Sequence, residues 1–178
     1  GGAAAMAINE SGQVVGKSLS PATGNKSHAF LYTNTGEMQD LGTLGGDSST
    51  ATDINDSGLI TGYSRNMNGL MHGFVCTGTT PMQDLGTLGG DTYAEKINST
   101  GQIVGVSGTV DGNSHAFVYA NSSMRDLNEL IDPSLGWNLI HAYGINDLGQ
   151  IVGYGARAGV SGPFRAFLLT PIPEPATA

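Results

Sequence analysis

Basic side chains are scarce in this sequence. Of its 178 residues only 7 are Lys or Arg, against 15 Asp or Glu, so the formal net charge is -8 at pH 7. Proteins that bind phosphate backbones or anionic lipid surfaces carry clusters of Lys and Arg. The composition therefore argues against nucleic acid as a partner.

Long apolar segments and paired cysteines are lacking too. No apolar run approaches the ~18 residues that a membrane-spanning helix needs, so we expect no membrane span. The first residues lack the basic and apolar regions of a signal peptide, which suggests a mature or trimmed chain. Cys76 is the only cysteine, and it has no partner for an internal disulfide.

Glycine, in contrast, is abundant, with 28 residues. A glycine in a helix interior costs about 1 kcal/mol relative to alanine. A glycine at about every sixth position therefore excludes long helices over most of the chain and favours short strands joined by tight turns. The sequence predicts an all-β protein.

One unit recurs four times along the chain. It begins with an Ile-Asn pair followed by a glycine and an apolar pair, and the asparagines of the four copies are Asn9, Asn55, Asn98 and Asn146. A segment of the type His-Ala-Phe-Leu-Tyr follows in each copy, and its first residues are His28, His72, His115 and Arg165. A third element, Met-Gln-Asp-Leu-Gly-Thr-Leu-Gly-Gly-Asp, begins at Met38 and Met82 and is degraded from Met124 onward.

Each unit contains about four short strands. Units of ~40–45 residues with four strands are typical of propeller blades. We therefore predict a β-propeller-like fold with repeats at about 1–44, 45–88, 89–131 and 132–171, the last lacking its fourth strand. These form one domain, 1–171, followed by a Pro-rich tail, 172–178. A β-solenoid is the alternative, although its coils repeat at shorter periods. The segment from Ser122 predicts a short helix with a serine cap.

These motifs resemble the extracellular repeat family named for its His-Ala-Phe (HAF) triplet, in which INDxGQIVGY, HAFLY and DLGTLGG segments recur. The resemblance covers residues 1 to about 170. In addition, Pro173, Glu174 and Pro175 resemble the motif that opens a PEP-CTERM sorting signal. The resemblance implies export to the outer surface or surroundings of a Gram-negative bacterium that makes extracellular polysaccharide.

The repeated polar residues are expected to serve the fold. Because the three histidines occupy one repeat position, and Arg165 takes it in the fourth unit, each is expected to make a local hydrogen bond in its own repeat. The repeated asparagines are typical of turns. His141 lies outside the repeat register near Trp137 and Tyr143, and these three residues are candidate ligand contacts.

The sequence offers no catalytic or metal-binding arrangement. Gly-x-Ser-x-Gly and phosphate-loop motifs are absent. The oxygen-rich segment 53–58 suggests calcium, but among its oxygen-bearing side chains only the asparagine recurs in all four units, as a turn requires. We therefore expect no cofactor and no metal.

The leading hypothesis is a non-enzymatic structural protein of the extracellular or biofilm matrix. The incomplete fourth repeat leaves an open strand edge, and such an edge is a template for pairing. Strand donation between copies of the chain would then give a filament or another oligomer. The alternatives are a carbohydrate-binding, lectin-like propeller that stacks sugars on Trp137, Tyr143 and Tyr154, and a propeller enzyme that uses His141, Arg157 and Arg165.

Overall fold

A computed structural model describes residues 2–20, 24–34, 36–160, 162 and 164–172. In this part of the chain nearly all regular structure is β-strand, arranged in four antiparallel sheets. Each sheet holds the strands of one sequence repeat, in chain order from one edge to the other. The predicted all-β class is confirmed, and so are the four strands of the first three repeats.

The strands that compose the four sheets are the following. The first sheet contains β1 (Ala3–Ile8), β2 (Val14–Ser20), β3 (Lys26–Tyr32) and β4 (Met38–Asp40). The second contains β5 (Gly45–Ile54), β6 (Ile60–Asn66), β7 (Met71–Cys76) and β8 (Gln83–Asp84). The third contains β9 (Gly89–Ile97), β10 (Ile103–Thr109), β11 (Ser114–Ala120) and β12 (Ser123–Asp126). The fourth contains β13 (Trp137–Ile145), β14 (Ile151–Arg157) and β15 (Arg165–Leu169).

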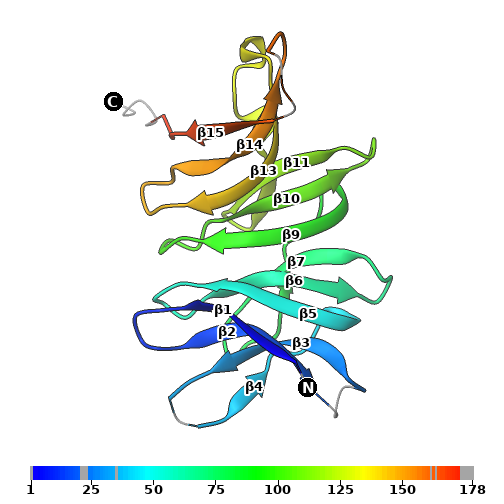
Figure 1. The fold of residues 1–178 in the computed structure, drawn as a ribbon, viewed down its shortest axis with the longest axis vertical. Coiled ribbons are helices and arrows are strands. Elements are labelled where there is room, and N and C mark those ends of the chain that lie inside the picture. The colour runs from blue at the N-terminus through cyan, green and yellow to red at the C-terminus, as the bar shows by residue number, and fades with distance from the viewer. Residues whose placement is uncertain (1, 21–23, 35, 161, 163, 173–178) are drawn as a thin grey trace.

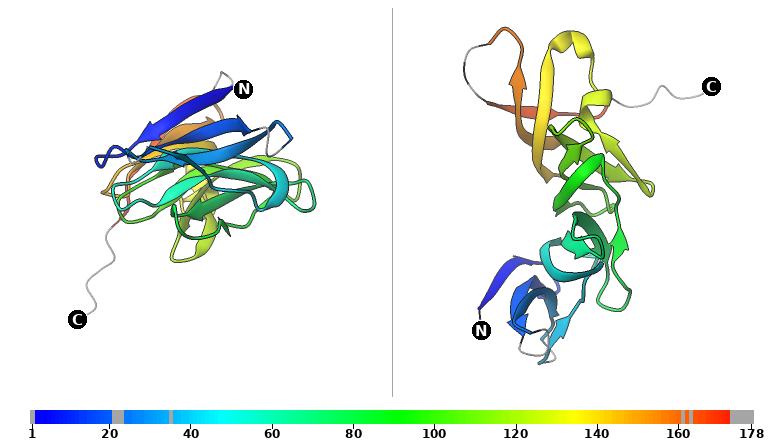
Figure 2. Two further views of the ribbon diagram at one scale, coloured as in Figure 1. Left: turned by 90° about the horizontal axis from the view of Figure 1, so that it is seen from below. Right: turned by 90° about the vertical axis from the view of Figure 1, so that its right-hand side faces the viewer.

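The sheets lie one after another along the longest axis of the molecule (Figure 1). The first and fourth sheets occupy opposite ends, and the right-hand view of Figure 2 shows the same order. The repeats are therefore blade-like sheets in an open row, and the described residues do not close into a ring. As the sequence predicts, the fourth sheet has three strands, and β15 is its edge strand within the described residues.

Apolar layers between consecutive sheets form the core. Between the first two sheets, Val15, Ala29 and Leu31 on one side belong to the same buried cluster as Phe74 and Cys76 on the other. The burial of Cys76 raises the pKa of its thiol to about 12. Equivalent clusters join the second sheet to the third and the third to the fourth. Each of the two inner sheets thus uses one face for its predecessor and the other for its successor.

The recurring Asn-x-x-Gly segment forms the turn between the first two strands of every sheet. In the first copy the Gly12 amide donates to the Asn9 carbonyl at 2.9 Å, and the Asn9 amide donates to the Gln13 carbonyl at 3.1 Å. Gly12 has a φ of 73°, and the equivalent glycines have φ of 80°, 82° and 72°. A side chain is strained in this left-handed conformation, so glycine is required there.

A second recurring glycine lies opposite a β-bulge in the first strand of each sheet. The bulge inserts one extra residue, and the inserted residues are Met6, Thr52, Glu95 and Tyr143. A Cβ atom on the facing glycine would lie 2.0 Å from a main-chain carbonyl oxygen of the bulged strand, and this holds at Gly16, Gly62, Gly105 and Gly153. The close approach of two strands therefore excludes any side chain at this position.

The connection from β12 to β13 differs from the sequence prediction. Instead of a serine-capped helix beginning at Ser122, residues 123–126 form β12, and a short 3-10 helix, η2 (Leu127–Glu129), follows. Asp126 caps this helix, because its carboxylate accepts from the Asn128 amide at 2.8 Å. Pairing with β11 holds the serine end in a strand. A second 3-10 helix, η3 (Pro133–Leu135), ends at Gly136.

Replacing Gly105 with alanine tests the bulge contact. The new Cβ atom would overlap the Tyr93 carbonyl oxygen, so we expect Gly105→Ala to lower the free energy of unfolding by about 3 kcal/mol. Urea denaturation measures the effect. Gly112→Ala is the control, because Gly112 has a positive φ but open space around it, and its expected cost is only about 1–2 kcal/mol. Equal losses in the two variants would contradict the steric explanation.

Candidate functional site at the open end of the stack

A line of asparagine side chains crosses every interface between consecutive sheets. The Nδ2 group of Asn9 donates to the main-chain oxygen of Asn55 at 3.1 Å. Asn55 Nδ2 donates to the Asn98 oxygen at 2.9 Å, and Asn98 Nδ2 donates to the Asn146 oxygen at 3.1 Å. We call this line the asparagine ladder; it joins the four repeats through one repeated hydrogen bond.

The same asparagines hold their own turns through the other atom of the side-chain amide. Oδ1 of Asn55 accepts from the Leu59 amide at 2.9 Å, and Oδ1 of Asn98 accepts from the Gln102 amide at 2.9 Å. Only an amide side chain both accepts and donates in this arrangement. The repeated position therefore requires asparagine, whereas an ionised aspartate would satisfy the turn but lack the donor to the next sheet.

Asn146 ends the ladder. The three preceding asparagines are buried, but Asn146 is exposed, because the described residues contain no further sheet beyond it. Its Oδ1 accepts from the Gln150 amide at 2.9 Å, and its Nδ2 donates to the Gln150 side chain at 2.8 Å. The three preceding asparagines donate their second N–H to the main-chain oxygen of an asparagine in the following sheet. Within the described part of the chain, the second N–H of Asn146 has no such acceptor.

The outward face of the fourth sheet exposes apolar positions that the other sheets bury. Val152 is 47% exposed, whereas the equivalent Val15, Thr61 and Val104 are each 0% exposed. Leu168 is 62% exposed, against 5% for the equivalent Leu31. We call the surface formed by Tyr143, Asn146, Val152, Tyr154 and Leu168 the end face.

The bulged residues of the two inner sheets contact the following sheet. In the second sheet the Thr52 hydroxyl donates to the Ala94 carbonyl of the third sheet at 2.8 Å. In the third sheet Glu95 Oε1 lies 3.1 Å from His141 Nε2 of the fourth. Tyr143, the bulged residue of the fourth sheet, is exposed, as is Met6 in the first sheet. The Tyr143 side chain is therefore open to a ligand or partner at the end face.

Aromatic rings cluster at this end. The His141 and Tyr143 rings stack with centroids 4.1 Å apart, and Tyr154 lies 5.7 Å from Tyr143. The exposed Phe164 meets Tyr154 edge to face at 5.1 Å. Desolvation, then the neighbouring Tyr154 and Glu95, raise the pKa of the Tyr143 hydroxyl. The structure thus brings together two of the three candidate ligand contacts, His141 and Tyr143.

The third candidate, Trp137, has a different environment. It is partly buried against the core between the third and fourth sheets, and the guanidinium carbon of Arg157 lies 5.9 Å from its ring centroid. Arg157 also donates from Nε to the Leu135 carbonyl at 3.2 Å. Trp137 is therefore held by intramolecular packing, apart from the ring cluster.

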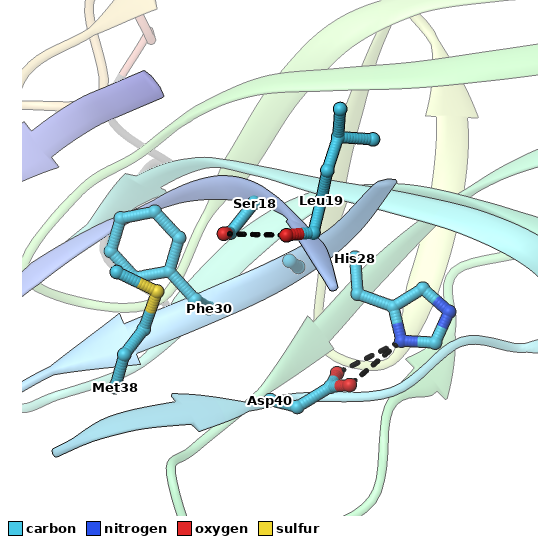
Figure 3. A pocket seen from close by; sticks show the side chains of 7 residues that line it. Ser18, Leu19, His28, Phe30, Met38 and Asp40 are labelled. Atoms are coloured by element: carbon cyan, nitrogen blue, oxygen red, sulfur yellow. Dashed lines mark hydrogen bonds and ion pairs between the residues drawn. The ribbon is translucent and has the colours of Figure 1, made fainter. Parts of the chain in front are cut away.

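The repeated histidines each contact an aspartate of the fourth strand in their own sheet. His28 Nδ1 lies 2.9 Å from Asp40 Oδ2, and Figure 3 shows this pair beside Phe30 and Met38 at a cavity of about 210 Å³. The equivalent pairs are His72 with Asp84 at 2.7 Å and His115 with Asp126 at 2.6 Å. In the fourth sheet Arg165 begins β15, opposite Gly155.

These aspartates also fix the turn that follows them. Asp40 Oδ1 accepts from the Gly42 amide at 2.8 Å, and Asp84 Oδ1 accepts from the Gly86 amide at 2.8 Å. The histidine therefore orients a carboxylate that secures the short fourth strand. Sequence reasoning missed these acidic partners, although they stand at one repeated position of the Asp-Leu-Gly-Thr-Leu motif.

The acidic loop considered for calcium is used in contacts between sheets. The Asp53 carboxylate contacts Lys96 Nζ and accepts from the Ile97 amide, both at 3.0 Å. Asp56 Oδ1 accepts from the Glu10 amide at 2.9 Å. Over the described ranges, no group of three or more His, Cys, Asp or Glu side chains is suitably placed for a metal ion.

Two sequence features remain to be placed. The Pro173, Glu174 and Pro175 motif lies outside the described residues. Where the structure describes the chain, it contains no helix with the length and apolar character for crossing a bilayer.

The sequence matches a known protein family. The family model DUF3466, described as a protein of unknown function, matches residues 2–139. The searches of curated proteins and of solved structures find no match. The matched segment includes the first three sheets and the connection to the fourth, and therefore most of the asparagine ladder.

Exchanging asparagine for aspartate at two rungs tests the ladder. Asn55→Asp keeps the turn acceptor but places a buried carboxylate against the Asn98 carbonyl, so we expect a loss of about 3 kcal/mol in the free energy of unfolding. The matched control is Asn146→Asp, with the same turn but no following sheet among the described residues, and it should cost under about 1 kcal/mol. Urea denaturation of both variants measures the difference, and similar losses would refute the ladder's role.

Proposed function

We propose that this chain, which belongs to the DUF3466 family of proteins of unknown function, is a structural protein of the bacterial extracellular matrix or cell surface. In this role it associates with copies of itself into a filament or another oligomer. Its likeness to HAF repeats and the Pro-Glu-Pro motif support an address outside a Gram-negative cell. The net charge of -8 keeps the polar parts of its surface solvated.

The observation that carries this proposal is the incomplete fourth sheet. In the other three sheets a fourth strand pairs with the strand that begins with the His-Ala-Phe motif, whereas β15 is an edge strand among the described residues. An unpaired strand edge presents free main-chain donors and acceptors to another chain. Strand donation from a second copy would complete the sheet.

The repeat indicates which residues of β15 take part. The Ala29 carbonyl accepts from the Leu41 amide at 2.9 Å, and the Gly73 carbonyl accepts from the Leu85 amide at 3.0 Å. The main chain at this repeat position therefore points toward the fourth strand. Ala166 is the equivalent residue of β15, so its C=O group faces the open edge. The equivalent N–H, that of Ala29, donates to the Ser49 hydroxyl of the second sheet at 2.8 Å.

The polar residues of the fourth repeat favour a non-enzymatic role. An enzyme would need reactive groups directed at a substrate. His141 instead contacts Glu95, and Arg157 contacts Trp137 and the Leu135 carbonyl. The buried thiol of Cys76, with its pKa raised to about 12, is not activated as a nucleophile.

Polysaccharide binding is a second candidate function, and the exposed ring of Tyr143 beside Tyr154 favours it. Aromatic faces of this kind stack on the apolar faces of sugars. We expect Tyr143→Ala to reduce co-sedimentation with an insoluble extracellular polysaccharide about tenfold. Val110→Ala is the control, because Val110 is exposed in a turn of the third sheet and away from Tyr143. Equal binding by both variants and the unmodified chain would contradict a sugar site at Tyr143.

The edge hypothesis is tested at Ala166. Ala166→Pro replaces the main-chain N–H beside the open edge with a ring that obstructs strand pairing there, so we expect assembly to weaken about tenfold or more while the fold persists. Ala166→Ser keeps the donor and should assemble like the unmodified chain. Light scattering coupled to size-exclusion chromatography measures the mass distribution. A compact monomer of the unmodified chain at all concentrations would overturn the proposed function.

A further inference from the structure

We infer that a second copy of this chain docks the outward face of its first sheet onto the end face of the fourth sheet. The contact would repeat, between molecules, the interface that joins consecutive sheets within one chain. This inference rests on the proposed self-association and adds to the pairing at the β15 edge a contact between sheet faces.

The first sheet exposes the positions that receive the preceding sheet elsewhere. Ile8 is 67% exposed, whereas the equivalent Ile54 and Ile97 are each 6% exposed and pack against the preceding sheet. Tyr32 is 39% exposed, while the equivalent Cys76 and Tyr119 are buried. We call the surface formed by Ala5, Ile8, Tyr32 and Met38 the head face.

The head face and the end face are the two halves of one interface. Inside the chain, Val15, Ala29 and Leu31 of the first sheet form a cluster with Ala51, Ile54, Phe74 and Cys76 of the second. Val152, Ala166 and Leu168 are the repeat equivalents of the first group. Ala5, Ile8, Phe30 and Tyr32 are the repeat equivalents of the second group. Each face thus lacks the partner that the other one presents, and apolar burial drives their contact.

The asparagine ladder supplies the polar part of the complementarity between the head face and the end face. Among the described residues, Asn146 carries an N–H donor without a following acceptor, and the main-chain oxygen of Asn9 accepts from Gly12 in its own turn but from no preceding asparagine. In the three internal interfaces this oxygen belongs to the following sheet and accepts from the preceding asparagine. A docked head face would therefore place the partner's Asn9 oxygen at the free donor of Asn146.

The geometry of the contact follows from its two different surfaces. Because the head face of one copy meets the end face of the next, the interface is heterologous, and each docked copy exposes a fresh end face. Repetition of such a contact gives an open filament unless the rotation between copies closes a ring. Docking of two end faces or two head faces would instead stop at a dimer.

Two blocked variants test this inference. Ile8→Glu places a charge in the head face, and Val152→Glu places one in the end face. Because both residues are exposed, the fold of each variant should persist, and circular dichroism checks this. Each variant alone should self-associate about a hundredfold more weakly than the unmodified chain, because a carboxylate would be buried at the contact. An equimolar mixture should form 1:1 dimers, since each variant retains the face that the other lacks. Val110→Glu, in an exposed turn, is the control and should assemble normally.

Sedimentation velocity distinguishes the outcomes. Monomeric variants and a dimeric mixture support head-to-end docking. If both variants assemble like the unmodified chain, these faces are not the interface, although self-association stands. If the unmodified chain itself stays monomeric, the proposed function fails together with this inference. If assembly requires added polysaccharide and only Val152→Glu abolishes it, the end face binds sugar, and docking of a second copy is overturned.

Discussion

The architecture depends on one hydrogen bond that the chain makes three times, from an asparagine side chain to the main chain of the next repeat. The donor atom leads to the following sheet, while the acceptor atom of the same amide holds the turn of its own sheet. Local structure and stacking are therefore coupled at a single residue. A buried amide with all its polar atoms paired also fixes the register between sheets, because a displaced sheet would leave donors unsatisfied.

Apolar burial supplies the larger part of the stability. Equivalent apolar clusters recur between each pair of consecutive sheets. Small residues and close strand contacts, such as that of Gly62 with the Thr50 carbonyl, bring the main chains together in each sheet. Phe74 and Phe117 fill the resulting space between sheets. The two inner sheets use both of their faces, whereas the outward faces of the first and fourth sheets are uncovered within the described residues.

Much of the fold could be predicted from the sequence, because the same turn and strand motifs recur in each repeat. The asparagine and glycine spacing predicted the turns, and the His-Ala-Phe register predicted β3, β7 and β11. The role of Asn55 as a donor to the next sheet was not predictable, since a turn explains the residue locally and nothing in one repeat shows its neighbour. The short strand at Ser123–Asp126 was mistaken for the start of a helix, because the pairing of Asp126 with His115 is a tertiary contact. The separation of Trp137 from Tyr143 likewise depends on which face of β13 each side chain takes.

The central claim is that copies of this chain continue the row of sheets from one molecule to the next. Electron microscopy of the assembled protein tests it most directly. Stacked sheets lie about 10 Å apart, so a filament built by continued stacking should have an axial repeat of about 40 Å for each four-sheet copy. Such a repeat, with no gap in sheet spacing at the junction between copies, is the predicted result. Assemblies in which copies lie side by side, with the end faces open to solvent, would contradict the account.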